Sequence, residues 1–424
     1  MKPPIRIGII GMGGFAGWHH ATVARLEERG HAKLVCTCDP QAPIFAEAQQ
    51  NWRLAARGVA IFTDYRAMLD QCQGQLDLVV VPTPIQMHAE MHEAVTARGL
   101  PAYLEKPPTL DAVELERMIV ADRRARKSSL VGFNFIVEKP RLALKERLLA
   151  GEFGSVRGAT LNALWPRPTS YFQRNNWAGR LFLDGGIVLD SCFGNAMAHF
   201  VHNMLFWTGA PGLFSWAQLA AVRAELYRAH AIEGADTFFV ETDTTSGITM
   251  RFAVSHACAG PSAHRETVLC DRAAIDYVVG HHAEVRWNDG RVERIPLEPF
   301  DGLTENHLEY YRYLHGELAR PATTLVDSRP LVALNDLAYI SSGRIAPIPP
   351  GLVTGERNDQ DQKDYLQVAG LAPAVELFLT RGLWPGANGW EREGGEVVTL
   401  GDLPRLPEVL RAISARNQLS ARPA

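Results

Sequence analysis

The sequence of 424 residues lacks the features that mark several classes of protein. Its six cysteines are unevenly spaced and include no C-x-x-C pair, which argues against a disulfide framework or a zinc site. It has no apolar run approaching the roughly 18 residues that a membrane span requires. The formal net charge of −4 gives no electrostatic argument for a nucleic-acid partner. We therefore expect a soluble, cytoplasmic protein with reduced thiols, bound neither to membrane nor to nucleic acid.

The order of apolar runs indicates how the chain is organised. Residues 5–10 form a strand-like run that ends at glycines, without a signal-peptide cleavage signature, and residues 16–29 follow with helical spacing. Strand-like runs at 33–38 and 76–82 and a helical stretch at 88–98 continue the alternation, which predicts a parallel sheet. After about residue 125 the strands follow one another directly and predict a mainly antiparallel sheet. These later strands are expected at 156–164, 237–240, 247–256 and 284–287.

A glycine-rich turn follows the first strand. Residues 11–16 read Gly-Met-Gly-Gly-Phe-Ala and satisfy the pattern G-x-G-x-x-G/A, in which glycines let the backbone approach a pyrophosphate and a small residue lets the helix pack. The start of the following helix then faces the phosphates. We assign Gly11, Gly13, Gly14, Phe15 and Ala16 to dinucleotide binding. The alternative is a strand-to-helix turn that holds no ligand.

Asp39 ends the next predicted strand, where a carboxylate would accept hydrogen bonds from the ribose hydroxyls of the cofactor. It would also repel a 2′-phosphate, and no arginine follows it. These two points favour NAD over NADP. The alternative is an aspartate that merely starts a turn before Pro40.

Several motifs occur in an order that resembles the Gfo/Idh/MocA oxidoreductases, over roughly residues 5–345. They are the glycine turn, Thr83-Pro84, His88, Glu105-Lys106-Pro107, Gly132-Phe133-Asn134, Asp184-Gly185-Gly186 and Ser341-Ser342-Gly343. The resemblance implies an α/β protein with an N-terminal Rossmann domain and a C-terminal α/β domain that carries an open, mainly antiparallel sheet. We place these domains at residues 1–125 and 126–350, with a C-terminal extension at 351–424. The extension has a helical pattern over 365–381, followed by a Gly/Trp-rich loop. A homo-oligomer, dimer or tetramer, is also implied.

The segment containing Lys106 is the first candidate for chemistry. Lys106 follows a predicted parallel strand, and open α/β sheets bind ligands at such strand ends. A partly desolvated lysine beside a nicotinamide would hold or relay the proton of a hydroxyl being oxidised. The resemblance implies this catalytic role for Lys106. The alternative from the residues alone is a solvated lysine paired with Glu105.

Other residues of this region are assigned to the cofactor by resemblance. Thr83, Pro84 and Glu105 belong to motifs that surround the cofactor, and His88 is expected near the nicotinamide. A histidine that merely begins a helix remains an equal interpretation of His88. The spacing of His88 and His92 lacks the glutamate of a metalloprotease motif, and we expect no metal site.

A second candidate stretch follows Asp184. The family run ends in Asp190 and normally has a histidine four residues later, where this chain has Gly194. Asn195, His199 and His202 would share one face of a helix over 195–202. We predict that Asp190 and His199 are catalytic partners of Lys106 and that Asn195 and His199 bind substrate. The alternative is that both histidines are interior or surface residues and that Asn195 only caps or packs.

Aromatic and arginine residues gather between these motifs. Arg167 and Trp177 lie in a turn-rich region with further aromatic residues, a composition on which sugar rings stack. Core packing explains such residues equally well. We assign Arg167, Trp177 and, by resemblance, Asn134 to substrate binding.

These assignments predict an NAD-dependent oxidoreductase that transfers hydride between the nicotinamide and a hydroxyl carbon of a sugar, cyclitol or derivative. One alternative is an NAD-retaining glycosidase that oxidises, eliminates and reduces again. Another is a redox-inert NAD-binding sensor whose extension at 351–424 contacts a partner.

Overall fold

The computed structural model describes residues 2–260, 262–388, 390 and 395–420. Contacts divide the chain into two compact units. Unit 1 comprises residues 1–138 and 301–329, and unit 2 comprises residues 139–300 and 330–424. No helix of the described residues is long and apolar enough to cross a membrane.

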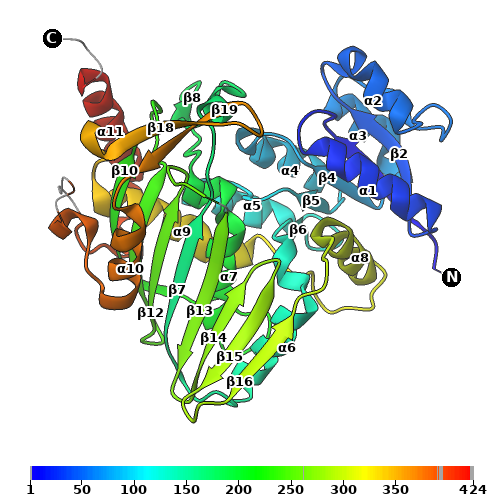
Figure 1. The fold of residues 1–424 in the computed structure, drawn as a ribbon. Coiled ribbons are helices and arrows are strands. Elements are labelled where there is room, and N and C mark those ends of the chain that lie inside the picture. Colours follow the sequence, from blue (N-terminus) through cyan, green and yellow to red (C-terminus); the bar gives the residue numbers. More distant parts are fainter. Residues whose placement is uncertain (1, 261, 389, 391–394, 421–424) are drawn as a thin grey trace. The chain divides into compact units, whose positions relative to one another are not determined.

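Unit 1 is built on a six-stranded parallel sheet in the order β3-β2-β1-β4-β5-β6. The strand β4 consists of four fully buried residues, Leu-Val-Val-Val, as expected where helices cover both faces of a sheet. Figure 1 shows this sheet and the helices of unit 1 up to residue 122 in blue and cyan. Its strands are β1 (Ile5–Ile10), β2 (Ala32–Cys38), β3 (Ala60–Phe62), β4 (Leu78–Val81), β5 (Ala102–Leu104) and β6 (Leu130–Val131).

The helices of unit 1 begin at local capping signals. Asp64 accepts a hydrogen bond from Ala67 N at the start of α3, and Asp111 accepts from Val113 N and Glu114 N at the start of α5. The helix α8 returns to this unit late in the chain. The helices are α1 (Ala16–Glu28), α2 (Ala46–Asn51), α3 (Tyr65–Cys72), α4 (His88–Thr96), α5 (Ala112–Asp122) and α8 (Gly302–Leu314).

Unit 2 is built on a nine-stranded mixed sheet in the order β16-β15-β14-β13-β7-β12-β11-β10-β17. All neighbours are antiparallel except β7 with β12 and β10 with β17. This confirms the predicted fold class. The strands are β7 (Val156–Leu164), β10 (Leu219–Arg228), β11 (Thr237–Thr244), β12 (Thr249–Ser255), β13 (Ala263–Cys270), β14 (Ala273–Val278), β15 (His282–Trp287), β16 (Val292–Pro296) and β17 (Ala346–Pro347). A separate hairpin joins β8 (Phe182–Leu183) to β9 (Gly186–Ile187).

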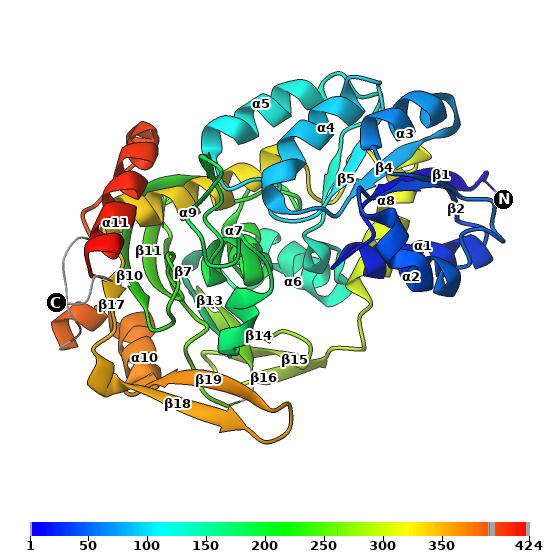
Figure 2. The same cartoon turned by 90° about the horizontal axis from the view of Figure 1, so that it is seen from above.

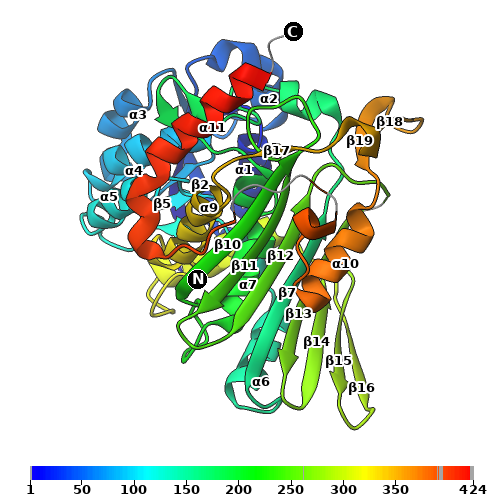
Figure 3. The same cartoon turned by 90° about the vertical axis from the view of Figure 1, so that its left-hand side faces the viewer.

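Helices cover both faces of this sheet (Figures 2 and 3). Phe238 packs edge-on against Tyr339 of α9, whereas its neighbour Phe239 packs edge-on against Phe378 of α10. Because successive strand residues point to opposite faces, α9 and α10 lie on opposite sides of the sheet. The helices are α6 (Lys139–Leu149), α7 (Ala198–Thr208), α9 (Arg329–Ser342), α10 (Leu371–Arg381) and α11 (Leu406–Ser420).

The predicted domain boundaries need correction. Unit 1 extends to Glu138 rather than residue 125, because β6 adds the sixth strand to its sheet, and it regains residues 301–329. The expected extension at 351–424 is part of unit 2, because α10 packs on β7 and β12 and shares a buried core with Phe239 and Trp390. Part of its Gly/Trp-rich loop lies outside the described residues.

One local prediction was also wrong. The helical pattern expected over 365–381 is a strand, β19 (Lys363–Val368), followed by α10, and Gly370 between them has a φ of +79° that breaks any continuous helix. The strand pairs with β18 (Val353–Asn358) in an antiparallel hairpin.

Candidate active site

The residues predicted to bind the cofactor follow four neighbouring strands of unit 1. Gly11 follows β1, Asp39 follows β2, Thr83 follows β4, and Glu105 and Lys106 follow β5. These strands are adjacent in the order β2-β1-β4-β5 and all run in parallel, so their ends meet at one edge of the sheet. The direction of winding reverses between β1 and β4, which is where doubly wound sheets bind dinucleotides.

The glycine turn has the geometry that close approach of a phosphate requires. Gly11 has a φ of +116°, and a Cβ there would lie 3.5 Å from Ala16 Cβ and 3.7 Å from Thr83 Cγ2. Gly14 has a φ of +55° and open space where a side chain would stand. A Cβ on Gly13 would lie 3.1 Å from the Phe45 ring. The turn therefore leaves its backbone accessible in front of α1, whose first turn of Ala-Gly-Trp-His carries no carboxylate to oppose a phosphate.

Asp39 joins the turn to the next strand. Its Oδ2 accepts a hydrogen bond from Met12 N at 2.9 Å, and its Oδ1 accepts from Gln41 N at 2.9 Å. The carboxylate therefore both starts a turn and tethers the glycine loop. A carboxylate has about four acceptor positions, so these two bonds leave capacity for ribose hydroxyls.

His20 contacts the backbone of the glycine turn, and this role was not identified from the sequence. Its Nε2 lies 3.1 Å from Gly11 O and 3.2 Å from Thr37 Oγ1, and its ring stacks on Trp52 at 4.2 Å. Burial lowers the pKa of His20 to about 4. A histidine on a helix face usually packs in a core, and its spacing gave no sign of this contact.

Glu105 is turned into unit 1, and its contact with the cofactor stays a prediction. Its Oε1 lies 3.0 Å from His19 Nε2, and its Oε2 accepts a hydrogen bond from Lys106 N at 3.2 Å. A Cβ on Gly132 would lie 2.9 Å from Oε1, so the glycine of the Gly132-Phe133-Asn134 motif makes room for this carboxylate. Glu105 thus holds the backbone of Lys106, which is the half-exposed residue of an otherwise buried run over 101–110.

His88 connects the loop that follows β4 to the loop that follows β5. Its Nε2 lies 2.8 Å from Thr83 O and its Nδ1 lies 3.1 Å from Pro107 O, and the side chain is 1% exposed. Burial lowers the pKa of His88, against the opposing effect of the two carbonyl groups. His88 therefore braces the Thr83-Pro84 segment against the Lys106-Pro107 segment from inside the unit.

Asn134 lies in a buried cluster of unit 1. Its Oδ1 accepts hydrogen bonds from Tyr103 OH at 3.1 Å and from Asn306 Nδ2 at 2.8 Å. These bonds tie the segment after β6 to α8. Its carbonyl group is thereby committed to the fold, and its contact with substrate remains a prediction.

Asp190 and Asn195 contact each other in unit 2. Asn195 Nδ2 donates to Asp190 Oδ1 at 2.7 Å, and Gly179 N donates to Asp190 Oδ2 at 2.8 Å. Arg174 Nη2 lies 3.5 Å from the same Oδ2. Asp190 is 3% exposed, so this carboxylate orders the surrounding loops.

The polar stripe expected on one helix is wrong. Residues Cys192–Ala196 form a π-helical turn, which Ser191 caps by accepting from Gly194 N at 3.0 Å, and α7 begins only at Ala198. Asn195 therefore precedes the helix that carries the two histidines. His202 is fully buried against Trp216, whereas His199 is half-buried in the first turn of α7.

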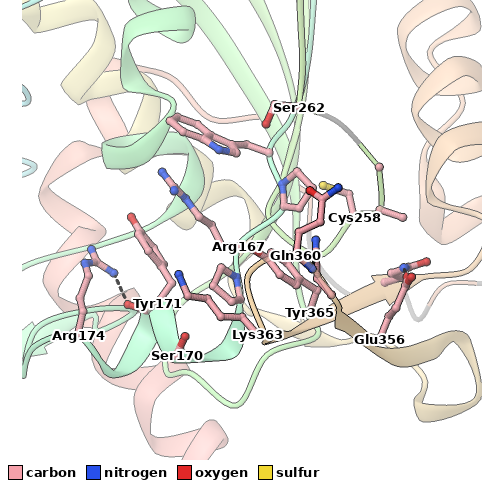
Figure 4. A pocket seen from close by; sticks show the side chains of 17 residues that line it. Arg167, Ser170, Tyr171, Arg174, Cys258, Ser262, Glu356, Gln360, Lys363 and Tyr365 are labelled. Carbon is pink, nitrogen blue, oxygen red and sulfur yellow. Dashed lines mark hydrogen bonds between the residues drawn. The ribbon is translucent and has the colours of Figure 1, made fainter.

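Arg167 lines a cavity of 870 Å³ in unit 2 (Figure 4). Its guanidinium carbon lies 3.9 Å from the centre of the Trp165 ring and 4.5 Å from that of Tyr171. The predicted gathering of arginine and aromatic residues thus forms one wall of a cavity. Trp177 lies beside Arg174, with 4.9 Å between the guanidinium carbon and the ring centre, and is not part of the lining.

Two family models match this chain. Residues 5–133 match the model described as the oxidoreductase family with an NAD-binding Rossmann fold, and residues 142–276 match the GFO/IDH/MocA C-terminal domain. Together the matches span more than half of the chain. The protein belongs to the Gfo/Idh/MocA family.

Relatives in this family act on sugars and cyclitols. The chain is 28% identical over 193 residues to a dTDP-3,4-didehydro-2,6-dideoxy-alpha-D-glucose 3-reductase of Actinomadura kijaniata, which covers 44% of this chain and 52% of the relative. It is 28% identical over 186 residues to an inositol 2-dehydrogenase of Rhizobium meliloti, covering 42% and 51%. The chain therefore matches about half the length of these relatives.

Solved structures share the Gfo/Idh/MocA fold over a larger part of the chain. A dehydrogenase from Bordetella pertussis in complex with NADH and UDP-GlcNAcA has a TM-score of 0.63 at 24% identity, covering 80% of this chain and 96% of that one. An oxidoreductase domain protein from Kribbella flavida has a TM-score of 0.67 at 19% identity, covering 80% and 97%. Among the described residues, no group of three or more His, Cys, Asp or Glu side chains is arranged to hold a metal ion.

Proposed function

We propose that this protein is an NAD-dependent oxidoreductase that transfers hydride between the nicotinamide and a hydroxyl-bearing carbon of a sugar, cyclitol or derivative. The observation that carries the proposal is the meeting of the glycine turn, Asp39, Thr83 and Lys106 at the ends of four adjacent parallel strands. Membership of an oxidoreductase family and relatives that act on sugars and inositol support the same chemistry.

The residues of unit 1 fit the cofactor. The backbone from Gly11 to Gly14 would approach the pyrophosphate, and Asp39 would accept the ribose hydroxyls. Asp39 also disfavours a 2′-phosphate, so NAD is preferred to NADP. When bound, NAD supplies the acceptor for a hydride.

Lys106 then holds or moves the proton of the reacting hydroxyl. Oxidation of an alcohol removes a hydride from carbon and a proton from oxygen, and a positioned side chain that takes the proton contributes about 10²–10⁴-fold. Glu105, bound to His19, and His88, bound to Thr83 and Pro107, fix the backbone on both sides of Lys106. These two are positioning residues.

In unit 2, His199 is the proposed partner that contacts the substrate hydroxyls. It is half-buried at the start of α7, whereas Asp190 accepts hydrogen bonds from Asn195 Nδ2 and from Gly179 N. We propose that Asp190 and Asn195 order this region, and that His199 contacts the substrate.

The test is a screen of sugars, cyclitols and glycosides with the purified protein and NAD, following both NADH and released aglycone. Stoichiometric NADH with an oxidised product supports the proposal. Release of aglycone without net NADH would favour the NAD-retaining glycosidase. Binding of NAD without turnover of any compound would favour the redox-inert sensor.

A further inference from the structure

The cavity that contains Arg167 lies within unit 2, and two of the segments that form its walls are far apart in the sequence. One wall follows β7 and includes Trp165, Arg167 and Tyr171, and the other is the hairpin β18–β19 with Lys363 and Tyr365 (Figure 4). A bridge between Pro168 and Tyr365 joins the walls. The hairpin lies beyond both regions that match the family models. We call this cavity the arginine pocket.

The pocket lies just past the ends of two parallel strands. Leu164 and Ser255 are paired at the ends of β7 and β12, and the chain continues from them into Trp165 and His256. Trp165 N donates to Ser255 O at 3.0 Å, and Arg167 N donates to His256 O at 3.3 Å. His256 Nδ1 also lies 2.8 Å from Trp165 O. The floor that holds Arg167 is therefore part of the ordered sheet.

Arg167 is a cation that has no acidic partner among the described residues. Its guanidinium lies between the Trp165 and Tyr171 rings, and among the described residues its Nε has no hydrogen-bond partner. Burial, with a smaller effect of Arg174, lowers the pKa of Arg167. Arg167 is half-buried, and its Nε is fully buried. Because desolvating a charge is costly unless it is paired, this arginine is suited to bind an anion from outside the chain.

The rest of the lining adds to this positive field. The described residues of the lining include three cationic side chains, Arg167, Arg174 and Lys363. They include one carboxylate, Glu356. Glu356 is itself bonded to Gln367 of the same hairpin. The remaining polar residues are amides and hydroxyls, which suit a polyhydroxylated ligand. They include Ser170, Ser262, Asn358, Gln360 and Gln367.

We propose that the arginine pocket binds the anionic group, carboxylate or phosphate, of an acidic sugar derivative that is the substrate. The anionic group is inferred from the pocket alone, whereas the sugar part of the ligand is inferred from the proposed function. Its volume of 870 Å³ falls within the range of small-molecule sites. Arg174 connects the pocket to Asp190, and through it to Asn195, so the anion site adjoins the predicted substrate region of unit 2.

The test compares matched neutral and anionic ligands by calorimetry on the NAD-loaded protein. Glucose, glucuronate and glucose 6-phosphate form one set, inositol and inositol phosphate form a second, and inorganic phosphate is measured alone. We expect at least one anionic member to bind tenfold or more tightly than its neutral counterpart, with an advantage that shrinks as salt is raised. The carboxylate and phosphate arms identify which anion the pocket takes.

Two variants assign the effect to the pocket. Arg167→Gln should abolish the preference for the anionic member, and Lys363→Gln, at an exposed position on the hairpin, should weaken it several-fold without affecting folding. Arg357→Gln is the matched control, because Arg357 belongs to the same hairpin and pairs with Asp364 outside the pocket. It removes the same charge and should leave binding unchanged.

Equal binding of neutral and anionic members, or an anion preference that survives both Arg167→Gln and Lys363→Gln, overturns the inference. So does inorganic phosphate binding as tightly as a sugar phosphate, which would mean an anion site without sugar recognition. NADH formation measured on the same samples separates the two proposals. Turnover of neutral sugars without any anion preference contradicts only the pocket, whereas an anion preference without turnover of any ligand contradicts only the hydride transfer.

Discussion

At the scale of single residues, the loops at the sheet edge of unit 1 where we propose that NAD binds are held by side chains that each make two contacts. Asp39 bonds Met12 N and Gln41 N, His88 joins two carbonyl groups, and Glu105 bonds His19 and Lys106 N. Each ties a strand-end loop to a neighbouring element. A loop that is fixed before the ligand arrives loses less conformational entropy on binding.

Asp39→Asn keeps an oxygen that can accept from Met12 N but removes the charge. We expect NADH to bind about tenfold more weakly, because ribose hydroxyls bond a charged acceptor more strongly than a neutral one. We also expect NADPH to bind more tightly than it does to the unaltered protein. Fluorescence titration with both nucleotides measures the two changes. A variant that retains the original preference for NADH would refute the assignment of Asp39.

At the scale of elements, unit 2 has a helix end that is capped by a buried side chain. Lys145 of α6 donates to the carbonyl groups of Phe206, Trp207 and Gly209 at the end of α7. The last carbonyls of a helix have no partner within it, and a lysine near them also complements the helix dipole. This contact joins α6 to α7, the helix that carries His199.

Lys145→Met should lower the free energy of unfolding by about 3 kcal/mol, because it removes charged hydrogen bonds and leaves buried carbonyl groups unsatisfied. Denaturant unfolding measures the change. Lys139→Met on the same helix is the control, since Lys139 is exposed and its replacement should stay within about 0.5 kcal/mol. Equal effects of the two variants would show that the cap contributes nothing.

Elements with a strong local pattern could be predicted from the sequence. The strand over 156–164 and the first strand over 5–10 match the structure, because each is an apolar run with nearby turn residues. The helix predicted over 365–381 failed because its first residues pair with β18, a partner that periodicity does not reveal. The stripe from Asn195 to His202 failed because Ser191 caps a π-helical turn before α7 starts.

The candidate site likewise contains residues that the sequence reveals and residues that only the structure reveals. The glycine turn and Asp39 are recognisable from the sequence because they belong to a short motif for dinucleotide binding. Other residues are far apart in the sequence and are brought together only by the fold. Examples are His19 with His307, and Arg167 with Lys363. No spacing rule predicts such pairs.

At the scale of the whole molecule, several buried and half-buried histidines are held neutral. Burial lowers the pKa of His20 to about 4, that of His256 to about 3 and that of His264 to about 4. Each folded-state pKa lies below the ordinary value of 6.5, so the unfolded chain binds protons first as the pH falls. Their contribution to stability is therefore complete above pH 6.5 and is lost as the pH falls from 6.5 towards 4.

The melting temperature should fall as the pH is lowered from 7 to 4, and His20→Gln should make that fall smaller. Glutamine retains a donor for Gly11 O but does not titrate. His31→Gln, at an exposed position, is the matched control and should follow the unaltered protein. Differential scanning calorimetry across this range gives the profiles. Identical profiles for all three proteins would contradict the role given to His20.

The central claim is that NAD lies on the glycine turn with Lys106 handling the proton of the substrate hydroxyl. It is tested most directly by measuring NADH binding and NADH formation in Lys106→Ala beside the control Lys139→Ala, at an exposed position of unit 2, with a substrate found in the screen. The account predicts that both variants bind NADH as the unaltered protein does, and that only Lys106→Ala loses turnover, by about 10²-fold or more. Full turnover in Lys106→Ala would contradict it.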